Sequence, residues 1–157
     1  MLKFNILILP VCCILIFTGC TTPAPQKTSL ELQAIQSREF ETTKKIGFAA
    51  TLSVFQDLGY IISSAEFNTG FITAKSPTKT QMAIFVGNVM TDTKATGFIE
   101  ELTPGKTKIR LNFVSSKETS TSYGMKSATD YPIEDPLIYQ NAFSKIREGI
   151  FIRSGIK

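Results

Sequence analysis

The sequence contains no histidine, and its three cysteines all lie within the first 20 residues. Histidine is the side chain that most often performs general acid–base catalysis near neutral pH, and histidine and cysteine are the usual ligands of zinc. No G-x-S-x-G or S-x-x-K motif is flanked by the partners that a nucleophilic serine needs, and the adjacent Ser144 and Lys145 point to different faces of a helix. These absences predict a protein that is not an enzyme and needs no cofactor.

The chain also lacks any long block of charge of one sign. It has 17 basic and 13 acidic residues, a formal net charge of +4, and the basic residues are scattered along the sequence. A nucleic-acid surface usually concentrates such charge on one face with aromatic residues between. Asp130, Glu134 and Asp135 lie close together but lack the regular ligand spacing of a calcium loop. We therefore predict neither a nucleic-acid partner nor a metal site.

A short apolar segment stands at the N-terminus. Residues 6–17 are apolar, follow a segment that carries Lys3, and are succeeded by the small residues Thr18 and Gly19. A helix that spans a bilayer needs about 20 apolar residues, and this run is shorter and contains Pro10. The pattern is typical of a secretory signal peptide, with an uncleaved signal-anchor helix as the alternative.

The residues FTGC at positions 17–20 resemble a bacterial lipobox. In proteins with this motif, a diacylglyceryl group is attached to the cysteine sulfur and the chain is cut just before that cysteine. The resemblance implies cleavage between Gly19 and Cys20 and a membrane anchor on Cys20. Thr21 rather than aspartate follows the cysteine, which in this family implies the outer membrane, with the protein on its periplasmic side. Two or three acyl chains hold a protein stably on a membrane, so no spanning helix is required.

The sequence divides into three parts. Residues 1–19 are the predicted lipoprotein signal peptide, and residues 20–29, which are small and polar with two prolines, are the predicted lipidated N-terminus and flexible tether. Residues 30–157 have the length and the apolar content of a single domain. The mature chain would keep one cysteine, so an intramolecular disulfide is excluded.

Hydrophobic periodicity and turn residues predict the elements of this domain. They are a strand at residues 35–40, a helix at 44–58, a hairpin at 60–74, a second hairpin at 96–114 and a helix at 136–151. The order β-α-β-β-β-β-α predicts an α+β fold, a two-layer sandwich in which an antiparallel sheet of about five strands carries two long helices on one face. The other sheet face or an unpaired edge would then be free for docking.

Two stretches do not fit this scheme. Residues 81–90 form an apolar run that periodicity assigns to neither helix nor strand. We interpret it as a short element that covers the core or, alternatively, as an exposed interaction surface made by Met82, Ile84, Phe85 and Val86. Residues 115–135 are rich in serine, threonine and glycine, and we expect a long loop there.

Three motifs together carry a wider resemblance. FQDLGYII at residues 55–62, TGFITA at 69–74 and DPLIYQNAF at 135–143 resemble, in that order, motifs of a large group of small, mostly uncharacterised bacterial lipoproteins. More loosely, the layout is similar to the helix-grip domains of BamC-type lipoproteins of the outer-membrane assembly machinery. These motifs are a helix end, a turn and a cap, so the resemblance implies a fold but brings no catalytic residues.

Two functional hypotheses follow. The first is a lipid-anchored, non-catalytic protein-interaction module, an accessory subunit of an outer-membrane or other envelope complex. The alternative is a small-ligand or lipid-binding lipoprotein that uses the groove between helices and sheet, with residues 81–90 as a lid.

Overall fold

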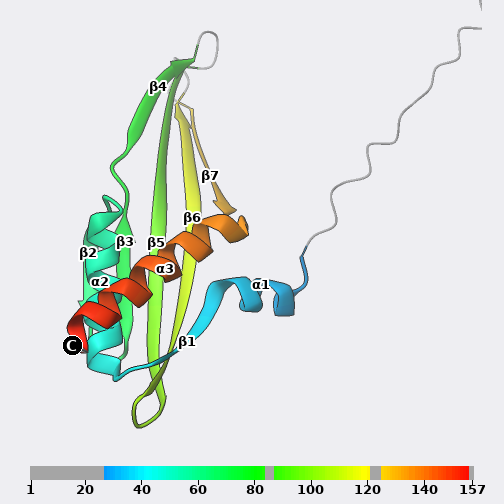
Figure 1. Ribbon diagram of the computed structural model, residues 1–157. Helices are drawn as coiled ribbons and strands as arrows, with labels where there is room; N and C mark the ends of the chain where they lie inside the picture. The colour runs from blue at the N-terminus through cyan, green and yellow to red at the C-terminus, as the bar shows by residue number, and fades with distance from the viewer. Residues whose placement is uncertain (1–26, 84–86, 121–124, 156–157) are drawn as a thin grey trace, which may run out of the picture.

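The structure of the protein is a computed structural model that describes residues 27–83, 87–120 and 125–155. The described part of the chain folds into three helices and one antiparallel seven-stranded sheet (Figure 1). In chain order the elements are α1 (Ser29–Gln36), β1 (Ser37–Glu41), α2 (Lys44–Asp57), β2 (Ile61–Glu66), β3 (Phe71–Lys75), β4 (Lys79–Ala83), β5 (Gly87–Thr103), β6 (Lys106–Ser120), β7 (Lys126–Pro132) and α3 (Pro136–Arg153). The predicted α+β class is confirmed, with more strands than expected.

A long hairpin made by β5 and β6 is the spine of the sheet. Its lower half lies inside a five-stranded sheet with the order β1-β6-β5-β3-β2, while its upper half pairs with β4 on one side and β7 on the other. Figure 1 shows β4 and β7 extending with the ends of β5 and β6 beyond helices α2 and α3. The fold therefore has a helix-covered body and a β arm, which we define as β4, β7 and the parts of β5 and β6 that pair with them.

Both long helices begin at the caps that their sequences provide. The Thr43 side chain accepts a hydrogen bond from the backbone N–H of Ile46, and the Asp135 side chain accepts one from Leu137 at 2.9 Å, with Pro136 in the first turn of α3. The two helices pack against each other and against one face of the sheet. The predicted helices and both predicted hairpins are confirmed.

The core lies between these helices and the sheet. Its members are fully or almost fully buried and come from every layer, among them Phe55, Ile72, Ile99, Ile109, Leu111 and Ile146. Close approach depends on small residues, because a Cβ on Gly97 would lie 3.3 Å from a methyl of Thr51 on α2. The groove that a ligand-binding function would need between helices and sheet is thus filled by side chains.

The predicted strand at residues 35–40 is wrong at its start, because helix α1 runs to Gln36 and β1 begins at Ser37. The helix is stabilised by a capping box, in which Thr28 and Glu31 each accept a hydrogen bond from the other's backbone N–H. The side chain of Lys27 also donates to the backbone carbonyl of Glu134, at the start of α3. Residues 27–29, placed in the predicted tether, therefore belong to the folded domain.

The long loop expected at residues 115–135 is also wrong. Strand β6 continues to Ser120 and pairs with β7 over seven positions. Threonine and serine suit a loop, but β-branched threonine also suits a strand, and a cross-strand hydrogen bond of 2.6 Å joins Ser116 to Asp130. Every residue of β7 is exposed, so this strand has no buried face.

Of the apolar run at residues 81–90, residues 84–86 lie outside the described part of the chain, and residues 81–83 and 87–90 lie in the β arm, away from the core. Strand β4 pairs with the beginning of β5, and Gln81, Asn88 and Met90 are exposed. Residues 81–83 and 87–90 therefore do not cover the described core. Within residues 27–83, 87–120 and 125–155, no helix has the length and apolar character needed to cross a membrane.

Candidate interaction surface

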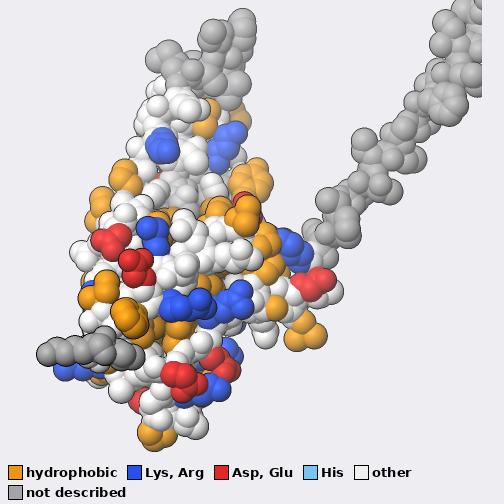
Figure 2. All heavy atoms as spheres, in the orientation of Figure 1, with side chains coloured by type: hydrophobic (Ala, Val, Ile, Leu, Met, Phe, Trp, Pro, Cys, Tyr) orange, Lys and Arg blue, Asp and Glu red, His pale blue; other side chains and the backbone are white. Residues whose placement is uncertain are grey.

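The sheet has one covered face and one open face. Along β6, Thr107, Ile109 and Leu111 are fully buried beneath the helices, whereas Arg110 and Asn112 alternate with them and are exposed. We call the side of the sheet that carries Arg110 and Asn112 the open face. It also includes the residues of the neighbouring strands that the register places on this same side. Figure 2 views the opposite, helix-covered side, where basic, acidic and apolar side chains lie interspersed.

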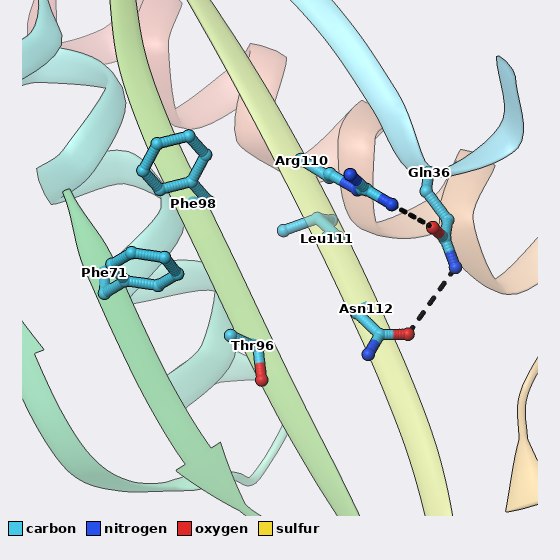
Figure 3. Close-up of a pocket in the computed structure, with 7 residues that line it drawn as sticks. All are labelled: Gln36, Phe71, Thr96, Phe98, Arg110, Leu111 and Asn112. Carbon is cyan, nitrogen blue, oxygen red and sulfur yellow. Dashed lines mark hydrogen bonds between the residues drawn. The ribbon is translucent and has the colours of Figure 1, made fainter. Parts of the chain in front are cut away.

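A pocket of about 480 Å³ lies on the open face where α1 meets β6 (Figure 3). The residues that line it come from four elements and are Gln36, Phe71, Thr96, Phe98, Arg110, Leu111 and Asn112. We call this set the open-face pocket.

Two phenylalanines form the apolar part of the open-face pocket. Phe71 and Phe98 are directly opposite each other on β3 and β5, with ring centroids 4.7 Å apart and ring planes inclined by 34°. Each belongs to a Gly-Phe-Ile triplet whose isoleucine, Ile72 or Ile99, is completely buried. Because side chains alternate along a strand, burial of the isoleucine turns the preceding phenylalanine to the open face. Phe71 is 47% exposed and Phe98 is half-buried, so solvent reaches the pair mainly at Phe71.

Gly70 fixes the position of Phe71. Its φ is +81°, and a Cβ there would lie 2.1 Å from the carbonyl oxygen of Ile99. The backbone N–H of Ile99 donates to the Gly70 carbonyl at 2.9 Å. Only glycine satisfies both the backbone angle and this close contact, which joins the start of β3 to β5.

Gln36, Arg110 and Asn112 form the polar wall of the pocket. The Arg110 guanidinium donates to Gln36 Oε1 at 3.4 Å, and Gln36 Nε2 donates to Asn112 Oδ1 at 3.5 Å. Both bonds are long, and Figure 3 shows the Arg110 and Asn112 side chains directed toward Gln36. Gln36 is only 8% exposed and stands at the end of α1, so the first helix supplies one side of the pocket.

The hydroxyl of Tyr139 on α3 supports this wall through hydrogen bonds on the covered side of the sheet. Its hydroxyl donates to the Ile133 carbonyl at 2.8 Å and accepts from the backbone N–H of Phe113 at 3.3 Å, and Gln36 Nε2 lies 3.5 Å away. Phe113 lies where β6 passes from pairing with β1 to pairing with β7. The buried hydroxyl thus fills a gap in the strand ladder and connects α3, the sheet and the pocket wall.

Most cations on the open face already have a carboxylate partner. Strands β3, β5 and β6 place four lysines there, and each forms an ion pair, with N–O distances of 2.7 to 3.8 Å: Lys75 with Asp92, Lys94 with Asp130, Lys106 with Glu39, and Lys108 with Glu100. A hydrogen bond from Lys106 lowers the pKa of Glu39. The pKa of Asp130 is lowered mainly by a hydrogen bond from Ser116 and next by one from Lys94. Arg110 differs, because within the described residues it contacts an amide and no carboxylate.

The chemistry of the open-face pocket is that of binding. It offers aromatic rings, side-chain amides, a hydroxyl and a guanidinium, which can stack, donate hydrogen bonds and pair with an anion. Among the residues that the structure describes, no three histidine, cysteine or acidic side chains lie close enough together to hold a metal ion.

The residues singled out from the sequence lie elsewhere or outside the described part of the chain. Met82 lies in β4, paired with Asn88, whereas Ile84, Phe85 and Val86 are outside the described residues, as are Gly19 and Cys20. The interaction surface predicted from these four residues therefore stays a prediction. Sequence reasoning missed the pocket, although the two Gly-Phe-Ile triplets were a usable signal for Phe71 and Phe98.

Comparisons with known proteins add little about function. No protein-family model and no curated protein matches the chain. A TBP-like protein from Parabacteroides distasonis, known from a crystal structure, aligns with 81% of this chain and 96% of its own at 14% sequence identity and a TM-score of 0.40. A similarity of this size carries no information about what the chain does.

Proposed function

We propose that the chain is a lipid-anchored, periplasm-facing lipoprotein whose α+β domain is a non-catalytic protein-interaction module, an accessory subunit of an outer-membrane or other envelope complex. The observation that carries the proposal is the exposed Phe71, paired with the half-buried Phe98 beside Arg110 on the open sheet face. Aromatic residues and arginine are enriched at protein interfaces and supply most of the residues that dominate binding energy.

The rigidity of the open-face pocket supports this function. Phe98 and Arg110 are directly opposite each other on the two central strands, and Phe71 is on the strand beside them. The backbone of paired strands is already fixed, so no binding energy is spent on ordering it when a partner binds. A surface built in this way is prepared for a macromolecular partner.

The anchor expected at Cys20 would place this surface near a membrane. The chain between Cys20 and Lys27 can extend over at most about 25 Å, and Lys27 is held at the start of α3. The domain would then stay within a short distance of the bilayer, where envelope complexes assemble. We favour this function over a small-ligand or lipid binder, because the groove required by the latter is filled by the core.

Two measurements on the full chain in its bacterial host test the proposal. Labelling with a radioactive fatty acid is expected to follow Cys20 and to vanish in Cys20→Ser, and label retained in that variant would refute the anchor. Purification of the tagged protein in mild detergent is expected to yield an envelope protein in stoichiometric amount.

A paired comparison assigns that partner to the open face. Phe71→Ala with Phe98→Ala is expected to lose the partner, whereas Leu137→Ala, which removes a side chain that is 69% exposed at the start of α3, is expected to retain it. The absence of any stoichiometric partner, or equal retention by both variants, would count against the interaction module.

A further inference from the structure

We propose that the open-face pocket receives an extended segment of a partner protein in which an aromatic side chain is followed, two residues later, by an aspartate or glutamate. This inference rests on the proposed function and specifies the chemistry of the partner. In the complex the aromatic side chain lies against Phe71 and Phe98, and the carboxylate pairs with Arg110.

The charge distribution on the open face calls for a carboxylate at this position. Lys108 lies in the row next to Arg110, Lys94 lies two rows away on the other side, and both already pair with carboxylates of this chain, Glu100 and Asp130. Among the residues that the structure describes, the Arg110 guanidinium donates to the amide oxygen of Gln36 at 3.4 Å and forms an ion pair with no carboxylate. A neutral oxygen at that distance satisfies a guanidinium poorly, so the fork of Arg110 retains donors for an incoming carboxylate.

Gln36 and Asn112 complete a site for one carboxylate. Gln36 presents its oxygen to Arg110 and its nitrogen to Asn112, which orients the two groups on either side of it. Gln36 is itself held from behind at Tyr139. Asn112, two residues along β6 from Arg110, adds an amide nitrogen to the hydrogen-bond donors of the pocket.

Spacing selects the sequence pattern of the partner. The rings of Phe71 and Phe98 are on adjacent strands, and Arg110 is on the next strand in the same row. Strands lie about 4.8 Å apart, so across the sheet the midpoint between β3 and β5 is about 7 Å from the backbone of Arg110, whose side chain extends further toward Gln36. In an extended segment, residues i and i+2 point to the same side and are separated by about 6.7 Å. A segment that crosses the strands with an aromatic at i and an acidic residue at i+2 therefore matches both parts of the pocket.

The test uses dye-labelled pentapeptides and the full chain purified in detergent. The matching probe is Ser-Phe-Ser-Asp-Ser-amide with the dye on its N-terminal amine, and its controls replace Asp by Asn or place Phe and Asp next to each other. Binding is followed by fluorescence anisotropy at low and at high salt. An exposed ion pair changes affinity by about threefold to fivefold, so the matching probe should bind about that much more tightly than the Asn control, and the difference should shrink at high salt.

Matched variants assign the effect to Arg110. Arg110→Gln should bind the Asp and Asn probes equally, whereas Lys108→Gln, whose lysine already has a carboxylate partner, should keep the preference for Asp. Thermal unfolding of each variant confirms that its fold is intact. The proposal is overturned if no probe binds saturably with a Kd of about 1 mM or tighter, if the Asp and Asn probes bind wild type equally, or if Arg110→Gln keeps the preference.

A single-stranded oligonucleotide is the competing occupant, because bases stack on phenylalanine rings and a phosphate can pair with arginine. Tighter binding of a hexauridylate than of the matching peptide would overturn the proposal. A failure here is distinguishable from a failure of the proposed function. If the detergent purification yields a partner that depends on Phe71 and Phe98 while the peptides show no preference for Asp, the interaction module stands and the stated partner chemistry is wrong.

Discussion

Removing one hydroxyl from the fold should show how strongly the pocket wall is supported. In Tyr139→Phe the ring stays in place, but the Phe113 N–H and the Ile133 carbonyl both lose their partner. Tyr139 is 1% exposed, so water does not readily replace the hydroxyl. A buried group left unsatisfied costs about 1 to 3 kcal/mol, and we expect the free energy of unfolding to fall by about 2 kcal/mol. For a domain of this size, that corresponds to a fall in Tm of about 8 °C.

Urea denaturation and calorimetry measure this change, and Tyr131→Phe is the matched control. Tyr131 lies on β7 and is 55% exposed, so its variant should remain within about 0.5 kcal/mol of wild type. Hydrogen exchange at the Phe113 amide should also accelerate in Tyr139→Phe relative to Tyr131→Phe. Equal stability of the two variants, with unchanged exchange at Phe113, would refute the reasoning that this hydroxyl bridges the strand ladder.

Two further predictions concern the sheet that carries the pocket. Gly70→Ala and Gly105→Ala both force alanine to a φ near +80°, which costs about 1 kcal/mol of stability. Of these two alanines, the one at position 70 also places its Cβ against the Ile99 carbonyl, so Gly70→Ala should be at least twice as destabilising in thermal unfolding. Equal losses of stability in the two variants would contradict this contact. The hydrogen bond from Ser116 lowers the pKa of Asp130 below its ordinary value of 3.8, so this carboxylate stabilises the fold above pH 3.8 and loses that effect as the pH falls further. The stability difference between wild type and Asp130→Asn, measured by urea denaturation, should therefore narrow below pH 3.8, and a difference that stays constant or widens would be inconsistent with the shift.

The body of the fold was predictable because its elements have one buried and one exposed face. The stripe on α3 that includes Phe143 and Ile146 and the alternation along β6 both follow from contact with a single core. Strand β7 gave no such signal, because all of its residues are exposed and a strand without a buried face need not alternate. Helix α1 was missed because it is only eight residues long and its sequence carries a mixed pattern.

The open-face pocket was only partly predictable. The two Gly-Phe-Ile triplets contain the information that Phe71 and Phe98 point away from the core, since each precedes a residue that must be buried. Their pairing depends on the register between β3 and β5, and Gln36 reaches Arg110 from a distant part of the chain. Such contacts follow from the tertiary fold and leave no local pattern in the sequence.

Site-specific photo-crosslinking in living cells tests most directly whether the open face is the interaction surface. A benzophenone amino acid would replace Phe71 in one strain and Phe151 in another, since Phe151 is 58% exposed on α3, away from the open face. We predict that irradiation yields a discrete crosslinked protein from position 71 and none from position 151. Crosslinks from position 151 alone, or the same products from both positions, would contradict the account.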